Sequence, residues 1–439
     1  MKKLIGFTAL IITAVFFFAG CKNENNSIPD KPSEPFTLKV GLYTSELEAL
    51  IQKYIDTHQD CGFDLEANQL ATDTYHDSLT NKLETGKYDI YMVESAYIGE
   101  YLKGNGSQYA MPFTELGITE QEINAAQISP YLLELGKNPQ GKLIGLDFYS
   151  NICCFAYRKD IAKTVFNTDD PAAITGKISP ANLSNSIAAL KTSGYAFLPS
   201  IGDLWQMSKD SVKTNGWVVN NKLYIDEYRL SFFDTAKLYY DSGYINTAFD
   251  QWNEAWYGEM KKSGKTFGFI APLWFLKYSI YINSTSDPAS WGICQTPLSC
   301  FWGGNFVLVN NKNMSDSKKK AIKDLITWLL LDTSTNGAMS LIANGQIDYI
   351  DNNCVPSKVV MDNNSYQHTL CGNQNIFEQY ATASANSEGI GAIYTEHEVK
   401  ISNLFIEQVR AYVKGWKTKE TAIADFKSAV AAQCNITVE

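Results

Sequence analysis

The stretch YDIYMVESAYI, residues 88–98, decides the fold class of this chain. Its first six residues have the composition of a buried strand, and they lead directly into the polar pair Glu94 and Ser95. Aromatic and aliphatic residues then resume at helical spacing. A buried strand that runs straight into a helix is typical of an α/β sheet, with the polar pair at the carboxyl end of the strand.

The residues before this stretch repeat the pattern. FTLKVGLY (36–43) predicts a first strand, 64–69 a second strand and 75–84 a helix, while Leu47 to Tyr54 have helical spacing. Strands that alternate with helices predict an α/β domain with a largely parallel sheet. Ligands bind beyond the carboxyl ends of such strands, so Tyr43, Glu94 and Ser95 are candidate ligand-binding residues.

Later segments show strands interrupted by polar residues. GKLIGLDFYSNICCFAYRKD (141–160) is two apolar runs broken by Asp147 and by 149–151. A buried strand at 266–270 leads into Trp274, and 291–309 predicts two strands around a Gly-rich turn. Ser315 is expected to cap a helix with an apolar stripe. Trp252 and Trp256, four residues apart, are expected to share one helix face in the core.

The N-terminus has the features of an export signal. Lys2 and Lys3 precede an apolar stretch, 4–18, that is too short to span a bilayer. The sequence FAGC at 18–21 resembles a bacterial lipoprotein signal, in which Cys21 would be acylated and become the mature N-terminus. Residues 22–36 have the composition of a flexible tether. We therefore expect residues 1–20 to be a signal peptide and 21–36 a lipid-anchored tether.

Charge and composition exclude some classes of function. The formal net charge is −10, and removal of the signal would lower it to −12, which argues against nucleic-acid binding. Aromatic residues make up 13% of the chain, a high fraction. Flat rings beyond the needs of a core are common ligand platforms, but an aromatic-rich core accounts for any single ring about as well. Zinc is not expected, because no CxxC or HxxxH spacing occurs, and no cofactor is predicted.

Eight cysteines follow Cys21, an even number that permits disulfides in an exported protein. Their connectivity cannot be deduced from the sequence. Cys294 with Cys300, and Cys354 with Cys371, are plausible local pairs. Cys153 and Cys154 are expected to point to opposite faces of a strand.

In this order the elements resemble the solute-binding proteins of bacterial ABC importers, of the sugar-binding type that includes maltodextrin-binding protein. Five blocks carry the resemblance across almost the whole mature chain: 88–102, 141–161, 263–274, 291–331 and 344–358. The resemblance implies two α/β lobes, each a mainly parallel sheet flanked by helices, joined by hinge strands. The lobes would hold 37–148 plus 298–331, and 149–297 plus 332–439. Chain crossings are expected near 147–151, near 296–298 and just after Leu331.

The resemblance also implies a ligand site between the lobes. It places Glu94 and Ser95 against the ligand, and Trp274 would stack on a sugar ring. The other candidate residues are at strand ends, crossings or aromatic positions: Tyr43, Asp147, Tyr149, Ser150, Trp205 and Trp302. Sugars present C–H faces and hydroxyl rims, which planar rings and polar acceptors match. The implied function is capture of a carbohydrate for an ABC permease, by a lipid-anchored monomer facing the periplasm or the exterior.

Other functions remain open at this point. A polar aromatic cleft also suits polyols, nucleosides or thiamine. A thiamine-degrading pyridinylase resembles these binding proteins in outline and uses a cysteine in the cleft as its nucleophile. The nearest cysteines in the corresponding segment of this chain are Cys153 and Cys154, which are displaced by a few residues. Glycoside hydrolysis would need two carboxylates, with Glu94 and Asp147 as candidates. A purely structural lipoprotein would not need the hinge pattern.

Overall fold

The computed structural model describes residues 35–211, 215–246, 250–312, 314–391 and 394–438. The predicted signal peptide, Cys21 and nearly all of the tether lie outside these residues. Among the described helices, none is both long and apolar enough to cross a membrane.

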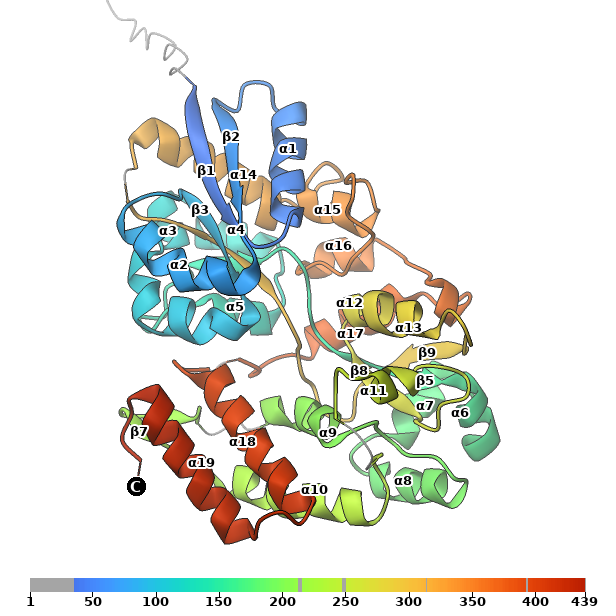
Figure 1. Cartoon of the computed structure of the whole chain (residues 1–439). Helices are drawn as coiled ribbons and strands as arrows, with labels where there is room; N and C mark the ends of the chain where they lie inside the picture. The colour runs from blue at the N-terminus through green and yellow to red at the C-terminus, as the bar shows by residue number, and fades with distance from the viewer. Residues whose placement is uncertain (1–34, 212–214, 247–249, 313, 392–393, 439) are drawn as a thin grey trace, which may run out of the picture. The chain divides into compact units, whose positions relative to one another are not determined.

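The first sheet is built around the stretch that opens the sequence analysis. Its strands are β1 (Phe36–Leu42), β2 (Phe63–Gln69), β3 (Ile90–Glu94), β4 (Gly145–Asp147) and β10 (Asn305–Val309), in the order β2-β1-β3-β10-β4. β1 is parallel to β2 and β3, whereas β10 runs antiparallel between β3 and β4. A strand from late in the chain therefore completes a sheet that begins at the N-terminus (Figure 1).

Helices cover this sheet as the apolar spacing predicts. α1 (Glu46–Thr57) contacts β1, β2 and α14 (Asp316–Leu330). Ser315 caps α14 by accepting a hydrogen bond from the backbone N–H of Lys318, and the predicted apolar stripe of α14 is buried. The remaining helices of this part are α2 (Thr72–Glu84), α3 (Phe113–Leu116), α4 (Glu120–Ala125) and α5 (Pro130–Gly136).

The second sheet has the order β8-β5-β9, with β5 (Cys154–Arg158), β8 (Gly268–Ala271) and β9 (Trp291–Cys294). β5 is antiparallel to both neighbours, so the expectation of a mainly parallel sheet is wrong for these three strands. β5 follows β4 directly, whereas helices precede both β8 and β9, so the alternation of elements along the chain did not indicate in which direction the three strands would pair. Parallel bridges join Ala196 to Thr266 and Leu198 to Ile245. The α/β class itself is confirmed.

Further helices follow β5 and β10 along the chain. α18 and α19 lie side by side, and α10 packs on α18 (Figure 1). β6 (Val218–Val219) and β7 (Lys222–Leu223) form a short antiparallel pair. The helices are α6 (Lys159–Phe166), α7 (Pro171–Lys177), α8 (Leu183–Thr192), α9 (Ile201–Ser208), α10 (Glu227–Asp241), α11 (Glu254–Gly258), α12 (Leu273–Phe275), α13 (Ile282–Ser284), α15 (Ala338–Ala343), α16 (Lys358–Asp362), α17 (Ile376–Ala385), α18 (Glu398–Val413) and α19 (Lys419–Cys434).

Two chain segments connect the sheets, 148–153 from β4 to β5 and 295–304 from β9 to β10. We call them the first and second crossing segments. They pair with each other through an antiparallel bridge between Ile152 and Phe301. The backbone N–H of Trp302 donates to the carbonyl of Asn151 at 3.0 Å. The two segments are therefore held in one register.

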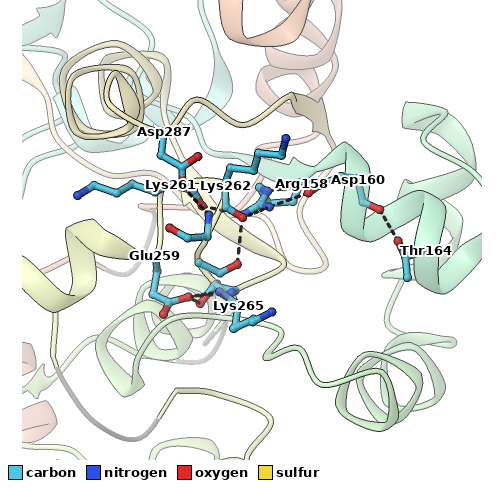
Figure 2. Close-up of polar contacts among 11 residues, drawn as sticks. Arg158, Asp160, Thr164, Glu259, Lys261, Lys262, Lys265 and Asp287 are labelled. Atoms are coloured by element: carbon cyan, nitrogen blue, oxygen red, sulfur yellow. Dashed lines mark hydrogen bonds and ion pairs between the residues drawn. The ribbon is translucent and has the colours of Figure 1, made fainter.

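The loop before β8 is fixed from the end of β5. The buried guanidinium of Arg158 donates to the carbonyls of Lys261, Lys262 and Gly264 at 2.7, 2.7 and 3.3 Å. From the other side, Glu259 accepts from the backbone N–H groups of Lys265 and Thr266. Figure 2 shows these side chains converging on the loop. β8, which leads to Trp274, consequently starts from a rigid position.

The expected helix carrying both Trp252 and Trp256 is wrong for Trp252. Trp256 is buried in α11, but Trp252 precedes that helix with a φ of 68° and is 49% exposed. Asn253 explains the difference, because it caps α11 by accepting from the N–H of Trp256, so the helix starts after Trp252. The two rings still touch, with centroids 5.0 Å apart.

The eight described cysteines are all free thiols, so neither local pair is bonded. Strand pairing separates Cys294 from Cys300: Cys294 pairs in register with Phe155, and the Cys300 segment pairs with the segment of Cys153. Cys153 and Cys154 lie in different hydrophobic clusters, which confirms that they point to opposite faces.

Candidate functional site

Polar residues meet where β3, β4 and β10 come together. Glu94 ends β3 and pairs across the ladder with Asn305, the first residue of β10. The hydroxyl of Tyr43, just after β1, donates to the side-chain oxygen of Asn305. The backbone N–H of Ser95 donates to the carbonyl of Gly304 at 3.0 Å. We call Tyr43, Glu94, Ser95, Asp147 and Asn305 the strand-end cluster.

Asp147 holds this cluster to the first crossing segment. Its side chain is fully buried and accepts hydrogen bonds from the backbone N–H groups of Tyr149 and Asn305 at 2.8 and 2.9 Å. It also accepts from the amide of Asn151 at 2.8 Å. Burial raises the pKa of Asp147 to about 7, although these hydrogen bonds oppose the shift. Its acceptor positions are occupied by the protein, which is the geometry of a positioning residue.

Glu94 is the more open carboxylate of the cluster. Its only hydrogen bond from a neighbouring side chain in the described residues is from the hydroxyl of Ser95, at 3.2 Å, and burial raises its pKa. Behind it, the Nε2 of His76 accepts from the backbone N–H of Glu94, while Nδ1 faces the carbonyl of Thr72. Burial lowers the pKa of His76 to about 4, so a neutral imidazole supports Glu94.

An aromatic group adjoins the cluster. The ring of Trp302 lies 5.4 Å from the rings of Trp274, Phe275 and Trp252. The indole N–H of Trp274 donates to the carbonyl of Trp302 at 2.9 Å. Trp302 packs against both hydrophobic clusters, one that spans the first sheet and one face of the second sheet, and one between the other face of the second sheet and the helices that follow β5. It therefore links the two parts of the site.

Gly303 allows this arrangement. Its φ is +95°, a conformation that favours glycine, and a Cβ there would lie 3.1 Å from the indole nitrogen of Trp274. The Gly-rich turn predicted at this place thus lets the two tryptophans approach each other.

A pocket of about 340 Å³ opens beside Trp302. Four tryptophans line it, together with charged and polar side chains from α9, α10 and α18. Its walls include Trp205, Trp217, Trp252, Trp302, Asp210, Arg229, Glu398 and Arg410. Rings and hydrogen-bonding groups in one concave site are the features of small-molecule binding sites.

The charges in the pocket are largely paired. Arg229 lies 3.9 Å above the ring of Trp217 and forms ion pairs with Asp226 and Glu398 at 3.2 and 3.6 Å. Burial raises the pKa of Glu398 to about 7. Asp210 accepts from the backbone N–H of Phe301 at 3.2 Å, and its pKa is also raised by burial. The pocket thus presents hydrogen-bonding groups with little net charge.

Comparison with known proteins decides the family. The family model described as bacterial extracellular solute-binding protein matches residues 49–346, more than half of the chain. The chain belongs to this family. No protein with a curated description matches this solute-binding protein by sequence.

Solved structures have the same fold at low sequence identity. A protein described as extracellular solute-binding protein family 1 has a TM-score of 0.74 and 15% identity, covering 89% of this chain and 98% of its own. The galacto-N-biose-/lacto-N-biose I-binding protein of the ABC transporter from Bifidobacterium longum, in complex with lacto-N-biose, has 0.62 and 16%, covering 93% and 99%. The sugar-binding protein MalE from Xanthomonas citri has 0.63 and 13%, covering 90% and 96%. The solute-binding protein therefore has the two-lobed fold of these relatives.

The predicted site residues fall into three places in this solute-binding protein. Six of them lie together, four in the strand-end cluster and two in the adjoining aromatic group: Tyr43, Glu94, Ser95 and Asp147, then Trp274 and Trp302. Tyr149 and Ser150 lie buried on the first crossing segment, and the Ser150 hydroxyl has no partner in the described residues. Trp205 lies apart on α9, where its indole donates to Ser402 at 2.9 Å at the edge of the pocket.

Sequence reasoning missed most of the pocket wall. Trp217, Arg229, Glu398 and Arg410 come from segments far apart in the chain, and none stands at a strand end. Trp252 carried a usable signal, since Asn253 after it is a strong helix cap that excludes the tryptophan from the helix.

Proposed function

We propose that this chain is the substrate-binding lipoprotein of an ABC importer, which captures a carbohydrate between two lobes and delivers it to a permease. The observation that carries the proposal is the tryptophan-lined pocket, joined through Trp302 to the strand-end cluster. Rings would cover the C–H faces of a sugar. Glu94 and the polar pocket residues would receive its hydroxyls, because each unmatched buried polar group costs about 1–3 kcal/mol.

The proposed lobes are 37–148 with 298–331, and 149–297 with 332–439. The two crossing segments, with a third crossing proposed after Leu331, would form the hinge. A ligand that binds the closed form better shifts the population towards that form, and the permease would recognise the closed, ligand-bound form. Two of the structural relatives are named for sugars, lacto-N-biose in one and sugars in general in the other.

We propose membrane attachment through lipid on Cys21, with residues 22–36 as the tether and a monomeric body facing the periplasm or exterior. The family description, extracellular, supports this location. The anchor would come from acyl chains alone.

A binding role without catalysis is the proposal for the site. The rival nucleophiles, Cys153 and Cys154, are buried, and burial raises the pKa of both thiols well above the usual value. A nucleophilic cysteine needs the opposite, a lowered pKa and access to solvent. The carboxylate of Asp147 is likewise enclosed by protein donors, which favours a positioning role over a hydrolytic pair with Glu94.

A thermal-shift screen of the chain against mono- and oligosaccharides, polyols, nucleosides and thiamine tests the proposal. A ligand that binds only the folded state raises the Tm, so we expect a shift with at least one sugar. Trp274→Ala should abolish that shift while Trp416→Ala, a change at a 72% exposed ring, leaves it intact. A shift with thiamine alone, accompanied by its breakdown, would replace the proposal with an enzyme.

A further inference from the structure

Two cysteines that are distant in the sequence face each other between the crossing segments. The antiparallel bridge of Ile152 with Phe301 places Cys153 directly opposite Cys300. The backbone N–H of Cys153 donates to the carbonyl of Cys300 at 2.9 Å. Directly opposed residues in an antiparallel pair have Cα atoms about 4.5–5.5 Å apart, which lies within the range of about 4.4–6.8 Å that a disulfide requires.

The side chains agree with the backbone. Cys153 and Cys300 belong to the same hydrophobic cluster, and both are almost completely buried. Cys154 points to the other cluster, which also holds Cys354, whereas Cys294 lies in the cluster of Cys153 but pairs in register with Phe155. Among the described cysteines, Cys153 and Cys300 are thus the pair that combines matched backbone register with burial in one cluster.

Both cysteines are free thiols in the structure. We propose that oxidation of the exported protein joins Cys153 and Cys300 in a disulfide bond, which cross-links the two crossing segments. The family is extracellular, and disulfides persist in that environment. Neither predicted local pair joins these two cysteines, because they are distant in the sequence and only the pairing of the crossing segments brings them together.

The bond forms by thiol–disulfide exchange with an oxidised disulfide, supplied by an oxidoreductase or by oxidised glutathione. The thiolate of Cys153 attacks one sulfur of the oxidant, forming a mixed disulfide and releasing one thiol. The thiolate of Cys300 then attacks the Cys153 sulfur and releases the second thiol. Two protein thiols are oxidised and the oxidant disulfide is reduced to two thiols. Because both cysteines are buried in the fold, exchange takes place before the segments are packed.

The proposed disulfide lies beside the candidate site. Asn151, whose side-chain amide donates a hydrogen bond to Asp147, is two residues before Cys153, and Trp302 is two residues after Cys300. The bond would therefore hold the register of the two segments that carry these side chains, whatever ligand the site takes.

Peptide mapping tests the bond. The full chain is reduced, unfolded, refolded with reduced and oxidised glutathione, and then denatured and alkylated without reductant. Trypsin should yield residues 143–158 linked to 278–312. Each of these peptides holds two cysteines, so variants assign the bond: the link should persist in Cys154→Ala and Cys294→Ala and disappear in Cys153→Ala and Cys300→Ala. Absence of the link in the wild type, or its survival in either of the last two variants, overturns the proposal.

A second measurement does not depend on mapping. The wild type refolded with glutathione should have a higher Tm than the wild type refolded in dithiothreitol, since a cross-link restricts the unfolded chain. The double variant Cys153→Ala/Cys300→Ala should have the same Tm under both conditions. Equal values for the two wild-type samples would contradict the bond.

Discussion

Replacement of Trp302 by alanine should weaken both the fold and the site. The ring has three aromatic neighbours at 5.4 Å. Each such pair contributes about 0.5–1.5 kcal/mol, so their loss should lower the free energy of unfolding by roughly 2–4 kcal/mol. The backbone bonds of Trp302 to Asn151 and Trp274 do not involve its ring, so the crossing segments should keep their register and the variant should fold.

The same change should reduce ligand affinity. Trp302 forms part of the pocket wall, and loss of one ring contact with the ligand, worth about 1.4 kcal/mol, corresponds to about tenfold in Kd. Urea denaturation followed by circular dichroism measures the first effect. Isothermal titration with the sugar found in the thermal-shift screen measures the second.

Trp416→Ala is the matched control, because the same side chain is removed from an exposed position. Trp416 is 72% exposed and has the ammonium of Lys414 5.2 Å from its ring. Its loss should cost less than about 1 kcal/mol and leave affinity unchanged. If Trp302→Ala is as stable as Trp416→Ala, the aromatic packing argument is wrong. If Trp302→Ala loses stability but binds ligand normally, Trp302 is not part of the binding site.

Three further predictions follow from other parts of the structure. Arg158→Met should lower the free energy of unfolding by about 3–5 kcal/mol in urea melts, because three carbonyls lose a buried charged donor. Asp160→Asn, which changes the exposed ion-pair partner of Arg158, should lower it by less than about 1 kcal/mol. Equal losses in the two variants would refute the role of Arg158 in fixing the loop. Glu398 has a folded pKa of about 7, above its unfolded value, so the stability gained from its protonation is complete below the unfolded pKa and is lost as pH rises through 7. The unfolding free energies at pH 5 and pH 8 should therefore differ less in Glu398→Gln than in the wild type, by up to about 3 kcal/mol. An unchanged difference would contradict this. Gly303→Ala should lower the free energy of unfolding by about 1–2 kcal/mol, because an alanine is strained at this positive φ. The added Cβ should also shift the indole of Trp274 and raise the Kd for the sugar. Unchanged binding in calorimetry would show that the turn does not position that ring.

Local sequence patterns predicted the elements of the fold well. The alternation of strands and helices from β1 to β3, the polar end of β3 and the cap and apolar stripe of α14 are all present in the structure. These features depend on residues a few positions apart, which contact each other within one strand or one helical turn. The polar strand ends also predicted which side chains meet in the strand-end cluster, because parallel strands end at the same edge.

Long-range pairing was beyond such patterns. No periodicity indicates that β10 enters between β3 and β4, that β5 runs antiparallel to β8 and β9, or that Cys300 faces Cys153. The pocket wall on α18 is a similar case, because a residue lines a pocket through packing between helices that are distant in the chain.

The sequence by itself therefore determined the α/β class, the family resemblance and the polar and aromatic residues at the ends of the strands. Only the tertiary structure decided that Trp252 joins the pocket, that Asp147 is enclosed by backbone donors, and that Trp302 connects the strand-end cluster with the pocket. The physical reason is that burial and hydrogen-bond partners are set by segments that meet through the sheets, and the spacing of residues along one segment contains no information about its distant partners.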